Sequence, residues 1–590
     1  MSRPADDYAQ RESARAARAE KLGRLETLIA GMRLVLAAVI VAMVWWSMFR
    51  HAFSAYWLII PAAGFVGLVL YHGTVRTGRA RAQRAVQFYR DGIARLEDRW
   101  EGKGEGGARF QDPHHVYSGD LDLFGTGSLF ELLCTARTRM GEEKLASWLL
   151  APASPDTLRE RQASIVDLRP RLDLREDLAV AGASAGTEMR PQALLDWAEA
   201  PNELTGVGVR VAAWSLPPLA IVTLVVWGWS WPFFLVLLIE GVVLAALGKQ
   251  IGRVLKDGEN AFEGMRLFAE LLTRMEREPY DAPPLQALIR RLRSHTLPAS
   301  RAIARLSTIA NLAGSRRNQI ILVAGVPLMY PLLVALAAER WRRDHGSVVR
   351  NWVDCVAELE ALLSLAAYGY EHPDDPFARI IDGPACFRAT QIGHPLIPEA
   401  RCVRNDVHVG DGARVLIVSG SNMSGKSTLL RTVGINTVLA MAGGPVRARS
   451  LELTPLQTGA SIRISDSLRE GSSHFYAEIR RLRQLFELAG RRPALLFLLD
   501  EVLQGTNSHD RRIGAEGIVR GFVSRGAIGL LSTHDLALTE IGEWEPGTVC
   551  NMHFQDELRD GRMTFDFKLR PGVVTKSNGL ELMRSIGLDV

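Results

Sequence analysis

The chain has 590 residues, 47% of them hydrophobic, and a formal net charge of +5 at pH 7. A chain of this length and apolar content can hold several domains, and the modest charge does not demand a nucleic-acid partner. The thiols are scattered without the spacing of a metal site, which excludes a zinc motif and suits a reducing cytosol; they are Cys134, Cys355, Cys386, Cys402 and Cys550.

The N-terminal region contains two apolar runs. An arm rich in Ala, Arg and Glu (residues 1–30) precedes Leu34 to Phe49, which carries no charge, and Ala55 to Tyr71 is again uncharged. Each run approaches the roughly 20 residues that cross a bilayer. We therefore predict a transmembrane hairpin at residues 31–73, after a cytosolic arm that is mobile or helical. The long polar arm and the lack of a small-residue cleavage site argue against a cleaved signal peptide.

A basic helix and a Gly-rich linker are predicted at residues 74–114, and a second apolar pair follows later. Val211 to Trp229 and Pro232 to Leu247 are joined by a short link, which predicts a second transmembrane hairpin at residues 206–250. Two closely spaced pairs favour membrane spans over the alternative, a set of buried core helices. Aromatic residues gather toward the ends of the runs, as at a membrane interface; they are Trp45, Trp46, Trp57, Tyr71, Trp214, Trp227, Trp229 and Trp231.

Basic residues flank both hairpins, whereas the short links within them are nearly free of charge. By the positive-inside rule, both ends of each hairpin then lie in the cytosol. Four crossings leave the N-terminus and the C-terminal region on the same side, so we predict a multi-pass protein of the inner (cytoplasmic) membrane. The flanking residues are Arg24, Arg33, Arg76, Arg79, Arg81 and Arg84 for the first hairpin, and Arg210, Lys249, Arg253 and Lys256 for the second.

Two further features of the apolar segments leave alternatives open. Glu240 lies inside the fourth run, where an acid is costly and often functional. It pairs within the helices, faces a partner or stays protonated, and a transport role is a distant third function for the chain. Ile320 to Ala338 is a fifth apolar run that contains Pro327 and Pro331. A fifth crossing would separate the two ends of the chain, so we read this run as a buried or membrane-lying helix.

The segment from Gly420 to Thr428 fits the phosphate-binding P-loop pattern G-x-x-x-x-G-K-[ST]. The apolar run before it, Arg414 to Val418, predicts a buried strand, and Leu429 to Met441 has helical spacing. Backbone N–H groups of such a loop and the helix N-terminus bind phosphate. The pattern predicts that Lys426 reaches the β- and γ-phosphates of ATP and that Ser427 binds Mg²⁺. The predicted ATP-binding residues are Gly420, Ser421, Asn422, Met423, Ser424, Gly425, Lys426, Ser427 and Thr428.

Two more apolar runs end in polar groups that suit nucleotide hydrolysis. Leu495 to Leu499 is followed by Asp500, placed to hold Mg²⁺, and by Glu501, placed to polarise the attacking water. Leu530 to Thr533 is followed by His534, which can sense the γ-phosphate. The order of P-loop, Asp-Glu and His matches an ABC-type ATPase. We therefore assign Lys426, Glu501 and His534 to catalysis, and Ser427 and Asp500 to the metal.

The residues between these motifs resemble the MutS family of DNA mismatch repair proteins. The similarity covers most of residues 115–590 and is most specific in the ATPase region. The matching segments are Asn422-Met423 within the P-loop, Asp466 to Glu478, Gly505 to Arg511, Phe567 to Gly572, Ser577 to Glu581 and Gly587-Leu588, with His394-Pro395-Leu396 before the P-loop and Ser128 to Phe130, Thr138, Gly141, Leu145 to Leu149, Pro152 and Arg161-Gln162 further upstream.

The resemblance implies a fold and an assembly. An α/β ABC-type P-loop ATPase domain would occupy residues 386–590 at the C-terminus. An all-α, MutS-like core and lever domain would precede it, at residues 115–205 and 251–385, with the two transmembrane helical hairpins inserted. Helical spacing of Trp341, Trp352, Leu359 and Leu362 supports helices in the second part. The family also implies ATP and Mg²⁺ as cofactors, and a homodimer in which Ser473 approaches the nucleotide of the partner in trans.

Departures from the family pattern shape the functional expectation. No Phe-x-Glu wedge for reading a mismatch is found before residue 115, and the chain has no room for the nuclease domain of some relatives. His474, Asn507 and Arg511 replace the usual Thr, Ser and Gly. We expect a membrane-anchored, Mg²⁺-dependent ATPase that switches a dimer in the cytosol and contacts the DNA backbone without sequence or mismatch readout. The alternative is a membrane ATPase that acts on an unknown protein partner or on the lipid bilayer, with no DNA role.

Overall fold

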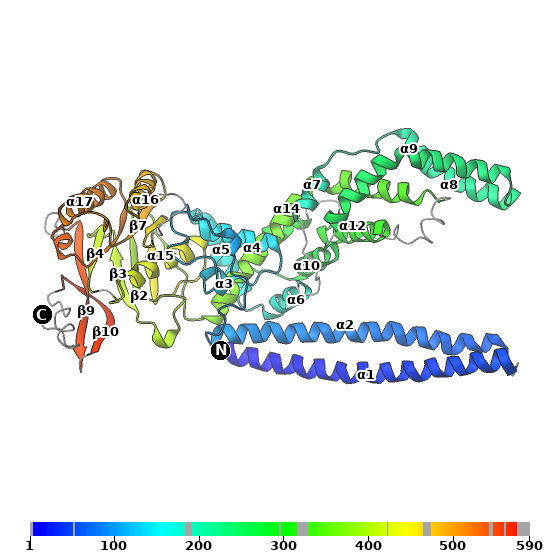
Figure 1. The fold of residues 1–590 in the computed structure, drawn as a ribbon, viewed down its shortest axis with the longest axis horizontal. Helices are drawn as coiled ribbons and strands as arrows, with labels where there is room; N and C mark the ends of the chain where they lie inside the picture. The colour runs from blue at the N-terminus through cyan, green and yellow to red at the C-terminus, as the bar shows by residue number, and fades with distance from the viewer. Residues whose placement is uncertain are drawn as a thin grey trace.

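A computed structural model shows an elongated molecule with an α/β region at one end and two helical hairpins at the other (Figure 1). The structure describes residues 4–50, 54–182, 191–262, 264–293, 297–314, 328–421, 423–463, 474–541, 547–559 and 562–574.

Each hairpin consists of two antiparallel helices. The first pairs α1 (Pro4–Arg50) with α2 (Ile59–Leu96), which follows the short helix η1 (Ala55–Leu58), and the second pairs α8 (Val207–Trp227) with α9 (Trp231–Phe262). Both tips point away from the α/β region (Figure 1).

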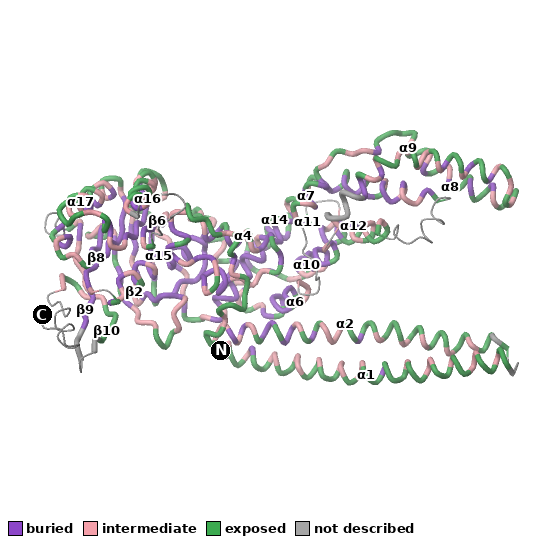
Figure 2. Tube along the Cα trace, in the orientation of Figure 1, coloured by how far each residue is buried: buried purple, intermediate pink, exposed green. Residues whose placement is uncertain are grey.

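These four helices are long and apolar enough to cross a membrane, by length and composition. Only 6% of the most apolar window of each helix in the first hairpin is buried, and 22% and 17% in α8 and α9. Figure 2 shows the exposed surface running along both tips. The alternative of buried core helices therefore does not fit the described chain, and an apolar surface of this extent requires cover from outside it.

The domain boundaries expected at residues 30, 73 and 250 each fall inside one continuous helix. The N-terminal arm is the first part of α1, the predicted basic helix is the second half of α2, and α9 runs past residue 250. A change from apolar to charged side chains alters the environment of a helix, but it does not interrupt the backbone hydrogen bonds that propagate it. Each of these three helices thus continues from its apolar segment into its polar segment without a break.

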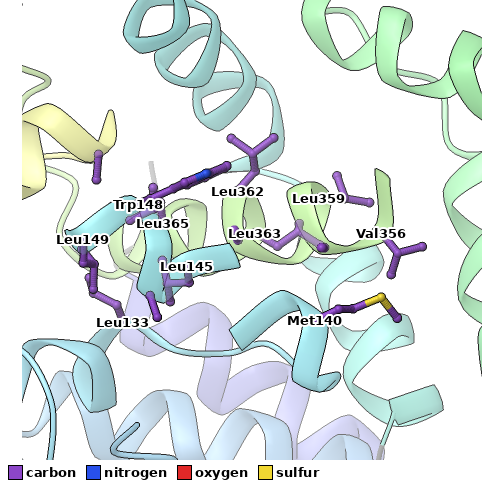
Figure 3. Packing of buried hydrophobic residues seen from close by; sticks show 14 of the residues in the cluster. Leu133, Met140, Leu145, Trp148, Leu149, Val356, Leu359, Leu362, Leu363 and Leu365 are labelled. Atoms are coloured by element: carbon purple, nitrogen blue, oxygen red, sulfur yellow. The ribbon is translucent and has the colours of Figure 1, made fainter. Parts of the chain in front are cut away.

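The long helix α14 (Tyr330–Glu371) forms the axis of that core. Figure 3 shows Leu362 of α14 beside Trp148 of α4, with Leu363 of α14 and Leu145 of α4 close by. Each leucine buried in this way contributes about 1.5–3 kcal/mol relative to exposure. The other core helices are α3 (Leu129–Leu133), α4 (Arg139–Leu150), α5 (Pro155–Leu168), α6 (Leu172–Gly182), α7 (Pro191–Glu199), α10 (Met265–Arg277), α11 (Pro283–Arg293) and α12 (Ala299–Gly314).

The fifth apolar run lies partly outside the described residues. Its last nine residues, from Tyr330, open α14, and Leu332, Ala335 and Ala338 are fully buried there. This described part agrees with a buried helix. Pro331 is tolerated because it occupies the first turn, where no backbone hydrogen bond is lost.

The C-terminal region is α/β, as expected. A six-stranded sheet has the order β10-β9-β4-β8-β7-β6, in which only β10 is antiparallel to its neighbour, and a second sheet has the order β1-β5-β2-β3. The helices α15 (Lys426–Ala442), α16 (His474–Leu488) and α17 (Ser508–Ser524) accompany the larger sheet. The strands are β1 (Arg379–Ile380), β2 (Phe387–Ile392), β3 (Asn405–Val409), β4 (Val415–Ser419), β5 (Ser450–Leu453), β6 (Leu456–Ser461), β7 (Ala494–Asp500), β8 (Ile528–Thr533), β9 (Val549–Arg559) and β10 (Arg562–Pro571).

The first hairpin is fastened to the end of α14 that enters the α/β region. Glu371 accepts hydrogen bonds from the Arg95 guanidinium, at 2.6 to 3.1 Å, and from the Tyr8 hydroxyl at 3.1 Å. The next residue, His372, accepts a hydrogen bond of 3.2 Å from Arg447 of the α/β region. Burial, together with the nearby Arg447 charge, lowers the pKa of His372 to about 4, so its ring is neutral at pH 7. Hairpin, long helix and α/β region therefore meet at one polar junction.

Candidate functional site

The P-loop connects the end of β4 to the start of α15, the context that the sequence predicts. Gly425 caps the helix in the left-handed conformation, with φ of 103°, and Met423 also has positive φ, at 73°. At Gly420, a Cβ atom would lie only 2.8 Å from the Ser424 hydroxyl oxygen, so the tight turn needs glycine there. Asn422 lies outside the described residues.

Lys426 is folded back over this loop. Its Nζ donates to the carbonyl oxygens of Gly420 and Ser421, at 2.9 Å each, and lies 3.7 Å from Oε1 of Glu501. Burial lowers the pKa of Lys426, and the neighbouring Glu501 and Asp500 charges oppose that shift. The Lys426 ammonium thus donates to two carbonyl oxygens, and the oxygens of a bound phosphate can take their place as acceptors.

The loop also holds polar atoms that find no partner in the described part of the chain. The hydroxyl oxygens of Ser421 and Ser424 are buried and make no hydrogen bond. A buried hydroxyl without a partner costs about 1–3 kcal/mol, which a bound ligand can recover. These orphaned hydroxyls, Lys426 and the N-terminus of α15 are the donor set that a phosphate requires, so the residues present fit a nucleotide.

Parallel strands bring the other predicted residues to the same edge. Ser419 at the end of β4 pairs in register with Thr533 of β8, and Ser532 of β8 pairs with Asp500 of β7. The P-loop, His534 and Glu501 follow these three strand ends directly, so they lie next to one another. Asp500 accepts a hydrogen bond from the Ser532 hydroxyl. The Asp and Glu motif, the histidine and the P-loop therefore lie side by side at one edge of the sheet.

Glu501 is the centre of this arrangement. Its Oε1 lies 3.1 Å from Nδ1 of His534 and 3.7 Å from Nζ of Lys426, and its other oxygen accepts a hydrogen bond from Gln504. Glu501 has φ of +49°, a conformation that costs a non-glycine residue about 1–3 kcal/mol. Strain of this kind is held in place by surrounding contacts and is concentrated at functional sites.

Two residues without an assigned role hold the turn after Glu501. Glu478 of α16, buried, accepts a hydrogen bond of 2.6 Å from the backbone N–H of Leu503. Arg511 donates to the carbonyl oxygens of Leu503, Gln504 and Thr506, at 3.1 to 3.4 Å. Arg511 thus clamps the turn that follows Glu501. Glu478 ends the segment Asp466 to Glu478 that the sequence analysis singled out, although no role was assigned to it there.

Phe567 of β10 is a further neighbour of the P-loop, and it belongs to a matching segment to which the sequence analysis gave no role in the site. A Cβ atom at Gly425 would lie 3.2 Å from its ring, and the side chain is 41% exposed. The Asn405 side chain holds the strand there, by donating to the Phe567 carbonyl at 3.0 Å and accepting from Leu569 at 2.8 Å. An exposed ring beside a phosphate loop offers a flat apolar face.

Three predicted features are not placed by this geometry. Ser473 lies outside the described residues, as does the closing segment from residue 575 onward. In the described chain, no group of three or more His, Cys, Asp or Glu residues could hold a metal ion. Magnesium in nucleotide sites is bound by one or two protein ligands plus phosphate oxygens and water, so Ser427 and Asp500 suffice in number.

Comparison with known proteins relates the C-terminal region, which contains this site, to a protein family. Residues 416–589 match the family model described as MutS domain V. The chain is 33% identical over 265 residues to the DNA mismatch repair protein MutS of an Exiguobacterium species, which covers 43% of this chain and 30% of that protein. It is 32% identical over 259 residues to DNA mismatch repair protein MutS 2 of Halobacterium salinarum (43% and 28%) and 33% identical over 196 residues to Endonuclease MutS2 of Thermus thermophilus (33% and 25%). The matches span less than a third of each of these relatives.

Proposed function

Because its C-terminal region makes this chain a MutS-family protein, we propose that it binds and hydrolyses ATP and uses the cycle to move its helical core and hairpins. The observation that supports this most is the convergence of Lys426, Glu501 and His534 beside the P-loop. Bound ATP with Mg²⁺ would supply the phosphoanhydride and the charge that activates it. Lys426 would neutralise phosphate charge, Glu501 would take a proton from the attacking water, and His534 would orient Glu501.

The contacts between the ATPase region and the helical core support a mechanical link. Asp120 accepts hydrogen bonds from the backbone N–H groups of Ile462 and Arg463, at 2.8 and 2.7 Å, immediately before the segment that contains Ser473. The carbonyl of Val116 accepts a hydrogen bond of 2.8 Å from Ala460 at the end of β6. A movement near the nucleotide would therefore pull directly on the chain that leads into α3 and α4.

The proposal includes a homodimer with two composite sites. The resemblance to the MutS family supports the homodimer, and it implies that Ser473 belongs to the segment that would complete the site of the partner subunit. Closure around ATP and reopening after hydrolysis would then be transmitted along α14 to the hairpins.

We further propose that the two hairpins anchor the protein in the inner (cytoplasmic) membrane, with the ATPase in the cytosol. The extent of uncovered apolar surface on four helices supports this. A reporter that is active only in the cytosol should work when fused before Met1 or after Val590, and should fail in the link at Arg50-His51. A cytosolic signal from the link, or silence at either end, would contradict the four-crossing arrangement.

DNA binding is proposed as weak and independent of sequence. The matched MutS relatives are named as DNA mismatch repair proteins, yet this chain offers only backbone-type contacts from arginines. We expect the ATPase rate of the reconstituted protein to change little with added duplex, and competition at physiological salt to show no preference for a mismatch. A preference of about tenfold, the scale of one base-specific contact, would contradict this expectation.

The second candidate function, action on a protein or lipid partner without DNA, is favoured by the size of the uncovered hairpin surface. Robust ATP hydrolysis together with no binding to any DNA form, in the same assay, would select it.

A further inference from the structure

The turn that carries Glu501, residues 501–506, has a strained backbone. Glu501 has φ of +49° and Leu503 has φ of +59°, a region that residues other than glycine rarely adopt. Such a conformation persists only where the surrounding contacts fix it. The contacts of this turn therefore decide where the Glu501 carboxylate lies.

Arg511 of α17 supplies three of these contacts. Its Nε donates to the Leu503 carbonyl at 3.1 Å, and its Nη2 donates to the carbonyls of Gln504 and Thr506 at 3.2 and 3.4 Å. A guanidinium is planar and its donors have fixed directions, so this one side chain sets the relative positions of three carbonyl groups. The compact ammonium of a lysine cannot reproduce the fork.

The third nitrogen of Arg511 faces the other half of the site. Its Nη1 lies 3.9 Å from Oδ2 of Asp535, the residue that directly follows His534. Asp535 is itself fixed, because its N–H donates to the Thr533 hydroxyl at 2.9 Å and its carboxylate accepts from the Ala537 N–H at 3.0 Å. The Arg511 and Asp535 side chains are 17% and 22% exposed, so solvent screens this contact only in part.

Together these contacts form a closed ring. Gln504, whose carbonyl Arg511 holds, donates through its side chain to Glu501. Oε1 of Glu501 lies 3.1 Å from Nδ1 of His534, and the next residue, Asp535, leads back to Arg511. A displacement of Arg511 would therefore move the turn after Glu501 relative to the turn that carries His534.

We propose that Arg511 is a positioning residue that sets the separation of Glu501 and His534 for the attack of water on the terminal phosphate. This inference rests on the proposed hydrolysis of ATP. Arg511 acts through the ring and does not touch the P-loop, whereas Lys426 and the loop hydroxyls are the groups that would bind phosphate. Loss of Arg511 should thus slow the chemical step and leave ATP binding intact.

The test compares Arg511→Ala with the unchanged full-length protein in detergent. We expect kcat to fall about 100-fold, the cost of misplacing a reacting group by about 1 Å, with KM and the binding of a fluorescent ATP analogue nearly unchanged. Arg511→Lys keeps the charge opposite Asp535 and should recover part of the loss. The matched control is Arg520→Ala on the same helix, whose side chain is 51% exposed and which should keep the normal rate.

A double variant separates positioning from a general loss of structure. Glu501→Gln turns over slowly and is followed under single-turnover conditions. Adding Arg511→Ala to it should cause little further loss, because the group that Arg511 positions can no longer accept the proton. A loss of the same factor in both backgrounds would overturn the proposal, as would a normal kcat in Arg511→Ala.

Asp535→Asn provides a decision if Arg511→Ala does not fold. Asparagine can still accept from the Ala537 N–H, but it lacks the charge that faces Arg511. It should lower kcat by a smaller factor than Arg511→Ala at unchanged KM, and a normal kcat would count against the ring. Failure of the proposed function is distinguishable, because the unchanged protein would then not hydrolyse ATP, or Glu501→Gln would keep its rate; either result would overturn the role of Arg511 as well.

Discussion

Glu501→Gln is expected to lower the steady-state rate of ATP hydrolysis by about 10²- to 10⁴-fold while ATP still binds. The glutamine keeps the shape of the side chain and its contact with Gln504, but it cannot accept a proton from water. Glu501 is the only described carboxylate that contacts both Lys426 and His534. Rates are measured by phosphate release, and ATP binding by a fluorescent analogue.

Two comparisons sharpen this expectation. Lys426→Ala should weaken nucleotide binding itself, because it removes the ammonium that now bonds the Gly420 and Ser421 carbonyls. Arg520→Ala, at an exposed position near the end of α17, should leave both rate and binding near their normal values. Unchanged hydrolysis in Glu501→Gln would remove Glu501 from the role of base.

Arg95→Ala is expected to destabilise the junction between the first hairpin and α14. The free energy of its local opening should fall by about 3–5 kcal/mol, because the buried Glu371 charge loses its partner. The Glu371 side chain is 2% exposed and Arg95 is 14% exposed, so the carboxylate would lose most of its donors in a site that water reaches poorly. The free energy of local opening is read from hydrogen exchange at the start of α1 and the end of α2.

The control for this change lies on the same helix. Arg90 pairs with Glu12 at 2.7 Å, but its side chain is 59% exposed, so Arg90→Ala should cost no more than about 1 kcal/mol. Adding Glu371→Gln to Arg95→Ala should recover part of the loss, because no buried charge then remains unpaired. Equal exchange in the Arg95 and Arg90 variants would show that the junction does not hold the hairpin.

Much of the site could be predicted from the sequence because it depends on short segments. The P-loop, Asp500-Glu501 and His534 each follow an apolar strand directly, and parallel strands place such ends side by side. The hairpins could also be predicted, because each apolar run is a continuous segment that approaches the roughly 20 residues of a membrane-spanning helix. The domain boundaries were harder to predict. The helices α1, α2 and α9 continue where the side chains change from apolar to charged, because this change leaves the backbone hydrogen bonds intact.

The sequence by itself therefore determined the residues of the candidate nucleotide site, the class of the fold and the four apolar helices. Only the tertiary structure decided the contacts that link them. Arg95 and Glu371 are separated by 276 residues, and Asp120 reaches Ile462 across 342. The contacts of Arg511 with the turn after Glu501 likewise exist only in the folded chain. Local patterns report the few residues that share a strand or a helical turn, whereas such contacts depend on how entire elements pack, which no short stretch of sequence encodes.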